Sequence, residues 1–310
     1  MFRSILVPLD GSSFAEQALP WAELIAQGCD STLNLVTGHR LYAFEDYSCA
    51  WAPYDAAQDA QFRQKEQQYL AAVATQKMTL EGDRVLTRVT DGLAADAILA
   101  GVRGTQADLI VMTTHGQGPL SRAFLGSVAD EVIRRAPVPV LLIRPDSTTL
   151  PSKPCVSSIM VPLDGSSFAE QIIPTVIGLA GKLNASCHLC SVVQPDTSVV
   201  TRREAGLEEG LNRTVPECGV DQAQAYLTGV AERFGQHSVQ ATSRVVEGHY
   251  VANAIVAEAQ NAKCELIALA THGRSGVKRL VLGSVADKVI RTANTPVLVL
   301  PAGAEVVLLG

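Results

Sequence analysis

The stretch Val7–Gln17 recurs without change at Val161–Gln171. The parallel continues further along the chain, where a Thr-His-Gly motif at His115 is matched by one at His272. The offset between the copies is 154 residues at the first motif and 157 at the second, so they differ by small insertions. Solenoid repeats have periods of about 20–50 residues, so this longer period indicates duplication of a whole domain.

Two domains also fit the chain length of 310 residues, since a globular domain typically holds about 150 residues. We expect the first domain at residues 1-146 and the second at residues 155-303. The stretch Asp146–Pro154 between them is rich in proline, serine and threonine, which is the composition of a linker.

Each copy alternates short apolar runs with segments of helical periodicity. Apolar strands that alternate with helices are typical of a parallel sheet covered on both faces. We therefore predict an α/β fold with two doubly wound parallel five-stranded sheets in tandem. Strands are expected at residues 5–7, 33–37, 85–90, 108–112 and 140–143, and again at residues 159–161, 188–192, 241–246, 265–269 and 297–300.

Local motifs predict several helix features. Long helices are expected near residues 57–78 and 221–234. Pro20 and Pro174 fall inside the helices that follow the first strands and should bend them. A capping box, serine followed three residues later by an acid, is predicted at four helix starts: Ser13 with Glu16, Ser127 with Asp130, Ser167 with Glu170 and Ser284 with Asp287.

Composition excludes some classes of function. The formal net charge of −6 does not suit a nucleic-acid-binding surface, which needs clustered positive charge. No run of about 18 apolar residues could span a membrane, and the N-terminus leads straight into a strand rather than into a signal peptide. We expect a soluble cytoplasmic protein with no nucleic-acid and no membrane partner.

The seven cysteines do not predict a disulfide framework, because their number is odd and the chain is long. Cys187 and Cys190 have the Cys-x-x-Cys spacing of redox and metal sites. They lie in an expected strand, however, where residues three apart point to opposite faces, and no second pair has zinc-site spacing. We predict two buried packing residues and no metal site.

A glycine-bearing loop follows the fourth strand in each copy. Nine residues separate Gly116 from Gly126 and Gly273 from Gly283, and a serine follows each second glycine. Glycine lets the backbone approach an anion, and a helix start offers unpaired N–H groups and the positive end of its dipole. The pattern favours phosphate binding, while a plain turn with a capping serine remains the alternative.

The second loop has the stronger anion-binding character, because it carries more positive charge and lacks the proline that removes an N–H in the first. The contrasting residues are Arg274, Lys278 and Arg279 in the second copy and Gln117, Pro119 and Arg122 in the first. We therefore expect the second copy to hold a phosphate ligand more tightly.

Asp10 and Asp164 stand where the first strand of each copy ends. In a doubly wound sheet, ligands lie outside the carboxyl ends of the strands, where the strand order reverses. We predict that these aspartates face a ligand, the alternative being a turn aspartate that bonds its own backbone. For His115 and His272, a loop histidine is favoured over a general base.

Three motifs together resemble the universal stress protein family: Val-Pro-Leu-Asp at the start of each copy, His-Gly-x9-Gly-Ser in the loop, and Pro-Val-Leu in the closing strand. The resemblance covers nearly the whole chain. The family loop is Gly-x2-Gly-x9-Gly-Ser/Thr, and Thr113 and Ala270 stand at its first glycine. The resemblance implies Rossmann-like domains of the adenine-nucleotide-binding type, paired within the chain as a pseudo-dimer. It also implies a stress-response protein that binds ATP, AMP or another adenine nucleotide, with or without Mg²⁺.

The resemblance implies a nucleotide site but no catalytic residue. In the first copy its residues are Pro8, Leu9, Asp10, Gly38, Met112, Thr113, His115, Gly116, Gly126, Ser127 and Val128. In the second copy they are Pro162, Leu163, Asp164, Val192, Leu269, Ala270, His272, Gly273, Arg274, Gly283, Ser284 and Val285.

Other functions stay open. One alternative is a slow ATPase or another ATP-dependent enzyme, although Asp10–Ser13 lacks the Ser-Gly-Gly-x-Asp-Ser loop of ATP pyrophosphatases. Another is a nucleotide-free interaction scaffold, and a homodimer is compatible with each function. The aromatic residues between Tyr42 and Tyr54 are interpreted as a loop over the sheet edge, with a lid or a protein contact as the alternative.

We expect the two copies to pair through their closing strands, Val140–Ile143 and Val297–Leu300. Each is the last strand of its sheet, and an exposed apolar edge would invite aggregation.

Overall fold

The computed structural model describes residues 1–40, 56–80, 82–115, 125–145, 153–195, 215–271 and 282–304, with the backbone alone for residues 215–218. The chain divides into two compact units, one holding Phe2–Pro154 and the other Cys155–Ala302. The predicted aromatic segment Tyr42–Tyr54 and most of both glycine loops lie outside the described residues.

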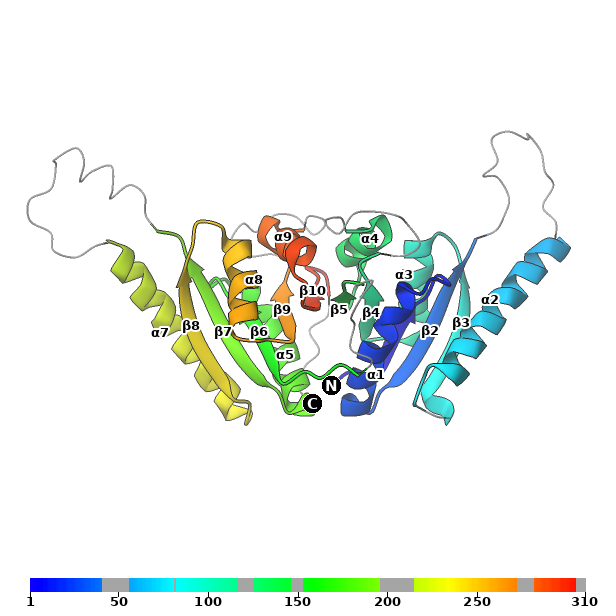
Figure 1. The fold of residues 1–310 in the computed structure, drawn as a ribbon, viewed down its shortest axis with the longest axis horizontal. Helices are drawn as coiled ribbons and strands as arrows, with labels where there is room; N and C mark the ends of the chain where they lie inside the picture. Colours follow the sequence, from blue (N-terminus) through cyan, green and yellow to red (C-terminus); the bar gives the residue numbers. More distant parts are fainter. Residues whose placement is uncertain are drawn as a thin grey trace, which may run out of the picture. The chain divides into compact units, whose positions relative to one another are not determined.

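The first unit alternates strands and helices along the chain (Figure 1). Its strands are β1 (Ser4–Pro8), β2 (Thr32–His39), β3 (Val85–Asp91), β4 (Leu109–Thr113) and β5 (Val140–Ile143). Its helices are α1 (Leu19–Cys29), α2 (Ala56–Gln76), α3 (Ala94–Thr105) and α4 (Ser127–Arg135), with short 3-10 turns η1 (Ala15–Ala18) and η2 (Gly82–Arg84).

The second unit repeats this order. Its strands are β6 (Ser158–Pro162), β7 (Ser186–Val193), β8 (Ala241–Glu247), β9 (Leu266–Ala270) and β10 (Val297–Leu300). Its helices are α5 (Ile173–Leu183), α7 (Val215–Gln236), α8 (Val251–Asn261) and α9 (Ser284–Thr292), with the 3-10 turn η3 (Ala169–Ile172). No described helix has both the length and the apolar character needed to cross a membrane.

Each unit has a five-stranded sheet, ordered β3-β2-β1-β4-β5 in the first unit and β8-β7-β6-β9-β10 in the second. The strand pairs within both sheets are parallel. The predicted fold of two doubly wound α/β sheets is therefore confirmed. The order reverses between β1 and β4, and between β6 and β9, so a crevice is expected beyond the carboxyl ends of these strands.

Helices cover both faces of each sheet. In β2, Gly38 lies against Ala97 of α3, whereas the next residue, His39, contacts Glu66 of α2. This alternation follows from the two-residue period of a strand. The central strands are apolar on both sides, and Ile5, Leu6 and Val7 are all completely buried.

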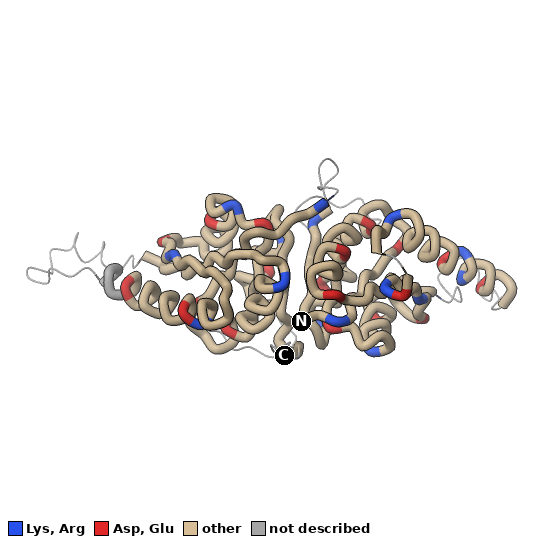
Figure 2. Tube along the Cα trace, turned by 90° about the horizontal axis from the view of Figure 1, so that it is seen from below, with Lys and Arg blue, Asp and Glu red and all other residues tan. Residues whose placement is uncertain are grey.

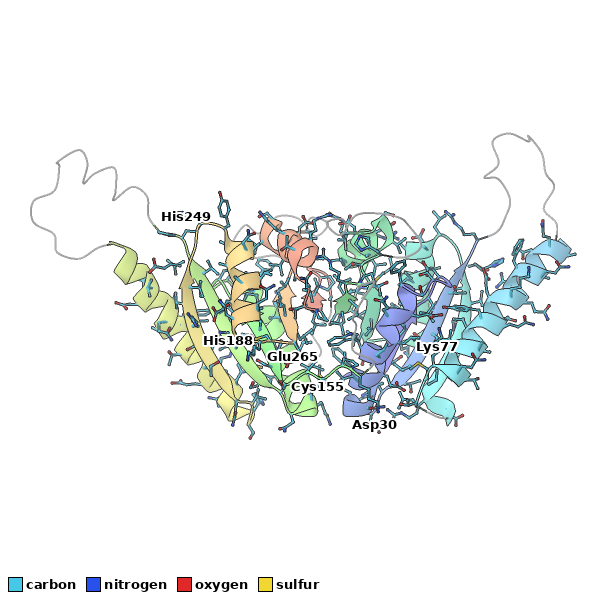
Figure 3. The ribbon with its side chains drawn as sticks, viewed as in Figure 1. Asp30, Lys77, Cys155, His188, His249 and Glu265 are labelled. Carbon is cyan, nitrogen blue, oxygen red and sulfur yellow. The ribbon has the colours of Figure 1, made fainter. Side chains whose placement is uncertain are left out.

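A carboxylate holds the start of the first strand in each unit. Asp108, just before β4, accepts hydrogen bonds from the backbone N–H groups of Arg3 and Ser4 at 2.8 and 3.1 Å. Glu265, labelled in Figure 3, accepts from Ser157 and Ser158 at 3.1 and 2.9 Å. The same contact therefore fixes the central strand pair in both copies.

Charged residues of both signs are interspersed along the elements of each unit (Figure 2). Several of them pair one helical turn apart, for example Arg134 with Asp130 and Arg291 with Asp287, each at 2.9 Å. Such pairs stabilise the helices individually by a few tenths of a kcal/mol (~0.3).

The helix starts differ from the sequence-based predictions. Pro20 and Pro174 lie in the first turns of α1 and α5, where proline needs no hydrogen-bond partner, so the predicted bends are wrong. The predicted capping boxes at Ser13 and Ser167 are also wrong. Instead, the hydroxyls of Ser12 and Ser166 accept hydrogen bonds from Ala15 and Ala169, each at 3.1 Å, and a 3-10 turn precedes each helix.

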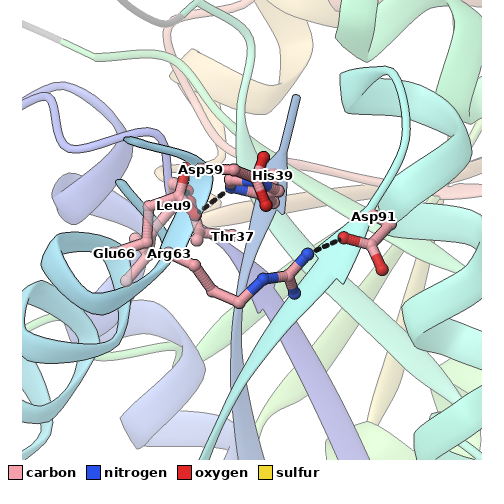
Figure 4. Close-up of polar contacts among 7 residues, drawn as sticks. All are labelled: Leu9, Thr37, His39, Asp59, Arg63, Glu66 and Asp91. Carbon is pink, nitrogen blue, oxygen red and sulfur yellow. Dashed lines mark hydrogen bonds and ion pairs between the residues drawn. The ribbon is translucent and has the colours of Figure 1, made fainter. Parts of the chain in front are cut away.

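A charged cluster attaches the first half of α2 to the sheet (Figure 4). The ring of His39, with 0% of its side chain exposed, contacts Glu66 through Nδ1 at 2.7 Å and Asp59 through Nε2 at 2.9 Å. Arg63 pairs with Asp91 at the end of β3. The buried residues of α2, Leu70 and Val73, both belong to its second half. Ionic contacts therefore hold the part of the helix that apolar packing does not.

The two units differ in one buried strand–helix contact. A Cβ atom added to Gly101 of α3 would stand 2.9 Å from Leu6 Cδ1 and 3.4 Å from Val36 Cγ1. In the second unit the position of Gly101 is taken by Glu258, which is buried and contacts His188 Nε2 of β7 at 3.0 Å.

The residues that surround Gly101 in the first unit also differ from those that surround Glu258 in the second. Met160 replaces Leu6, Cys190 replaces Val36 and His188 replaces Asn34, so the surroundings of the glutamate differ and include a partner for it. The strand and the helix have thus changed together.

Candidate functional site

A tight turn follows the first strand of each unit. Asp10 Oδ1 accepts hydrogen bonds from the backbone N–H of Ser12 at 3.0 Å and from its hydroxyl at 2.6 Å, and Asp164 Oδ1 accepts from the Ser166 N–H at 2.9 Å. The glycine between these partners has a φ of +82° or +79°, in the left-handed region that favours glycine. The turn interpretation of both aspartates is therefore confirmed.

A cavity of about 300 Å³ lies at the switch point of the second sheet. Asp164 lines it, so the turn aspartate also faces the cavity. The cavity is formed by the carboxyl ends of β6, β7 and β9 and by the first turns of α8 and α9. The residues predicted from sequence that line it are Pro162, Leu163, Asp164, Val192, Leu269, Ala270, Gly283, Ser284 and Val285.

Several lining residues were missed by sequence reasoning, namely Ala169, Cys190, Val251, Ile255, Thr271 and Ala286. Two signals could have found some of them. Cys190 lies two residues before Val192 and so points to the same face of β7. Val251 and Ile255 are four residues apart at the start of the helix after the Glu-Gly turn, and so share one helix face.

The start of α9 differs from the predicted capping box. The N-cap residue is Gly283 rather than Ser284, and no side chain caps the helix. The N–H of Gly283 donates to Thr271 O at 2.9 Å, so it is not available to an anion. The amides at the start of the helix itself, beginning with Ser284 and Val285, have no acceptor within the helix.

The first unit has the same helix start. Gly126 caps α4 in place of the predicted Ser127, and its N–H donates to Thr114 O at 2.8 Å. A Cβ atom at Gly126 would stand 2.8 Å from that carbonyl oxygen, so this close approach requires glycine. Ser127 and Val128 are the first two residues of α4.

The other residues predicted for the first site gather at the same sheet edge. Pro8 ends β1, Met112 and Thr113 end β4, and Gly38 lies near the end of β2. The backbone of Leu9 is fixed, because its N–H donates to Val36 O at 2.8 Å and its carbonyl accepts from Thr37 Oγ1 at 2.6 Å.

The ring of His115 contacts one neighbouring side chain. Its Nδ1 lies 2.9 Å from Thr114 Oγ1, and its Nε2 is buried with no hydrogen bond within the described part of the chain. Burial, and then the nearby charge of Arg144, lowers the pKa of His115. The ring is therefore neutral at pH 7.

Four predicted site residues, Gly116, His272, Gly273 and Arg274, lie outside the described residues, as do Lys278 and Arg279. Among the residues that are described, no group of three histidines, cysteines or acids is placed to hold a metal ion.

The prediction of two buried cysteines is confirmed. Cys187 and Cys190 are 1% and 0% exposed, and burial raises the pKa of each thiol to about 12. Both are therefore protonated and unreactive at neutral pH.

Replacing Cys187 and Cys190 together by alanine is expected to leave ligand binding independent of reductant. The free energy of unfolding should fall only by the cost of two small cavities, about 1–2 kcal/mol. The measurement is ligand titration with and without reductant, together with metal analysis. Stoichiometric zinc in the wild type that is lost in the variant would contradict the packing role.

The fold and the cavity together define the class of protein. It is a tandem α/β protein of two doubly wound units, with a cavity of about 300 Å³ at the switch point of the second sheet. The sequence model of the universal stress protein family matches residues 1–144 and 156–301. The chain therefore belongs to the universal stress protein family, with one family domain in each unit.

Individual relatives agree with this assignment. A universal stress protein of Mycobacterium tuberculosis is 27% identical over 302 residues, covering 96% of each chain. A universal stress protein of Thermus aquaticus is 37% identical over 145 residues, covering 46% of this chain and 100% of its own. The crystal structure of a universal stress protein from Archaeoglobus fulgidus has a TM-score of 0.69 at 19% identity and covers 97% of this chain and 98% of its own.

Proposed function

We propose that this universal stress protein binds an adenine nucleotide, ATP or AMP, in one or both of its domains at residues 1-146 and 155-303, and acts as a nucleotide-dependent regulatory module in the stress response. The observation that carries the proposal is the cavity of about 300 Å³ at the second switch point. Its volume lies at the lower end of the range for ligand pockets, about 300–1,000 Å³.

The lining of the cavity has two chemically different ends. Val192, Val251 and Ile255 supply apolar walls suited to a planar base. Ser284 and Val285 supply the start of α9, whose amides and dipole suit a phosphate group. Asp164 lies at the same cavity and offers a carboxylate to a ribose hydroxyl or to the amino group of a base. A nucleoside phosphate matches all three features.

The direct test is mass spectrometry of the small molecule released when the purified full chain is denatured, followed by titration with ATP and AMP. Release of an adenine nucleotide, or saturable binding of one, supports the proposal. A chain that releases no nucleotide and binds neither one contradicts it. Multiple-turnover release of phosphate that is lost in Asp164→Ala would instead favour the ATPase.

Gly283→Val is expected to weaken the tighter nucleotide site by about tenfold or more. The backbone of Gly283 is bonded to Thr271 O at 2.9 Å, and a branched side chain here displaces the helix start at a cost of about 1–3 kcal/mol. Gly126→Val is the matched variant and should affect only the weaker site. Calorimetric titration of both variants checks the assignment, and loss of the tighter site in Gly126→Val would contradict it.

A further inference from the structure

An aromatic–cation pair joins the residue that precedes α8 to α9 in the second unit. Tyr250 directly precedes Val251, a lining residue, and 73% of Tyr250 is exposed. The Nζ atom of Lys288 lies 5.8 Å from the centre of the Tyr250 ring. This distance is within the range of a cation–π contact. The ammonium group is therefore held near the residue that precedes the lining residue Val251.

Lys288 also lies close to the expected phosphate end. It follows Ser284 by four residues and Val285 by three, so the three side chains share one face of α9. Cβ atoms of a helix tilt toward its N-terminus, which directs the Lys288 side chain toward the first turn. Both Ser284 and Val285 line the cavity.

The first unit provides an internal comparison. Glu131 of α4 stands at the position of Lys288, and Leu93 stands at the position of Tyr250. Arg135 binds Asp96 at 2.7 Å and also pairs with Glu131. In the second unit, Asn253 and Thr292 replace Asp96 and Arg135. Asp96, Glu131 and Arg135 together carry a net charge of −1 in the first unit. Their counterparts Asn253, Lys288 and Thr292 together carry +1 in the second unit.

We propose that Lys288, positioned by Tyr250, is a specificity-determining residue of the second nucleotide site and favours nucleotides with more than one phosphate group. The inference rests on the proposed function. It is independent of the basic residues in the glycine loop, because it depends on α8 and α9 alone.

The expected effect follows from Coulomb's law. In a partly solvated site, each additional phosphate charge near the lysine gains about three- to tenfold in affinity. ATP carries more negative charge than AMP, so the wild-type site should prefer ATP. The preference should shrink as salt is raised, since the lysine is exposed and ions screen it.

The test is calorimetric titration of the full chain with ATP and with AMP, at low and at physiological salt. Lys288→Glu should lower the ratio of ATP to AMP affinity at the second site by about tenfold, and Lys288→Gln by about threefold. Tyr250→Leu, which installs the residue of the first unit, should lower the ratio less. Lys182→Glu is the matched control: it reverses one charge in the last turn of α5, at the opposite edge of the sheet, and should leave the ratio unchanged.

Repeating the titrations in a chain that also carries Gly126→Val isolates the second site. Fitting two sites to titrations of chains without Gly126→Val gives the ratio of ATP to AMP affinity at the second site independently of that substitution. An unchanged ratio in Lys288→Glu, with both nucleotides still bound, overturns the inference and leaves the proposed function intact. A fall of the same size in Lys182→Glu also overturns it. Binding of neither nucleotide by the wild type overturns both.

Discussion

Replacing His39 by glutamine is expected to lower the free energy of unfolding of the first unit by about 2–4 kcal/mol. Glutamine has one amide donor group and one carbonyl acceptor, so it cannot donate to both Asp59 and Glu66 as a protonated histidine does. One carboxylate then faces a carbonyl oxygen near the end of β2. The two carboxylates are 11% and 27% exposed, which keeps the expected cost below that of a fully buried pair.

The same cluster makes the stability of the first unit dependent on pH. Burial lowers the pKa of His39, but hydrogen bonds to Asp59 and Glu66 outweigh burial, so the pKa is raised above its ordinary value of 6.5. The folded state therefore binds the proton more tightly than the unfolded state. The contribution is fully present below about pH 6.5 and is lost as pH rises through the folded pKa.

The measurement is urea unfolding followed by tryptophan fluorescence at a series of pH values that starts below about pH 6.5 and rises into the alkaline range. Both tryptophans, Trp21 and Trp51, belong to the first copy, so the signal reports that unit alone. His237→Gln is the control, because His237 is an exposed residue of the second unit. A wild-type stability that does not fall with rising pH relative to His39→Gln would contradict the role of the cluster.

Gly101→Glu should destabilise the first unit by about 4 kcal/mol or more. Its Cβ would meet Leu6 and Val36, two buried residues, and its carboxylate would have no counterpart of His188 to pair with. Gly104→Ala, three residues along the same helix, is the matched control. Its Cβ meets only the end of the Arg88 side chain at 3.1 Å, so the change should stabilise by up to about 1 kcal/mol.

Tryptophan fluorescence again provides the readout for these variants. Adding Asn34→His and Val36→Cys to Gly101→Glu supplies the partner and part of the space found in the second unit, while the contact with Leu6 remains. This triple variant should recover part of the lost stability. Equal stability of Gly101→Glu and the wild type would show that α3 can move away from the sheet.

Much of the fold followed from the sequence because the strands are continuous apolar runs. The closing strands Val140–Ile143 and Val297–Leu300 have the predicted bounds, and the other strands differ by a few residues at their ends. The polar or small ends of strands were harder to predict. β2 extends beyond the predicted end at Thr37 through Gly38 to His39, because both residues pair with β3 although they are not apolar.

The starts of α4 and α9 could not be predicted from local motifs because the deciding contacts are distant in sequence. Serine and an acid three residues apart suggested a cap at Ser127, but the carbonyl of Thr114 bonds Gly126 and makes the glycine the N-cap. No sequence motif predicted the charged cluster around His39, because its two partners lie 20 and 27 residues further along the chain. At the cavity, most motif residues were found, although Thr271 beside a motif was missed. The spacing of Val251 and Ile255 shows that they share a helix face, but only the packing of α8 shows that this face lines the cavity.

The joint change of β7 and α8 relative to β2 and α3 restricts how the two halves of the gene can exchange sequence. Gene conversion copies one continuous tract from one half into the other. A tract that carried the codon of Glu258 into the first half without those of His188 and Cys190 would place a carboxylate against Leu6 and Val36. A tract that carried only the strand codons would leave a cavity beside Gly101 and a histidine with no acid. A tract that reaches this contact is therefore expected to preserve it only when the tract spans both the strand and the helix.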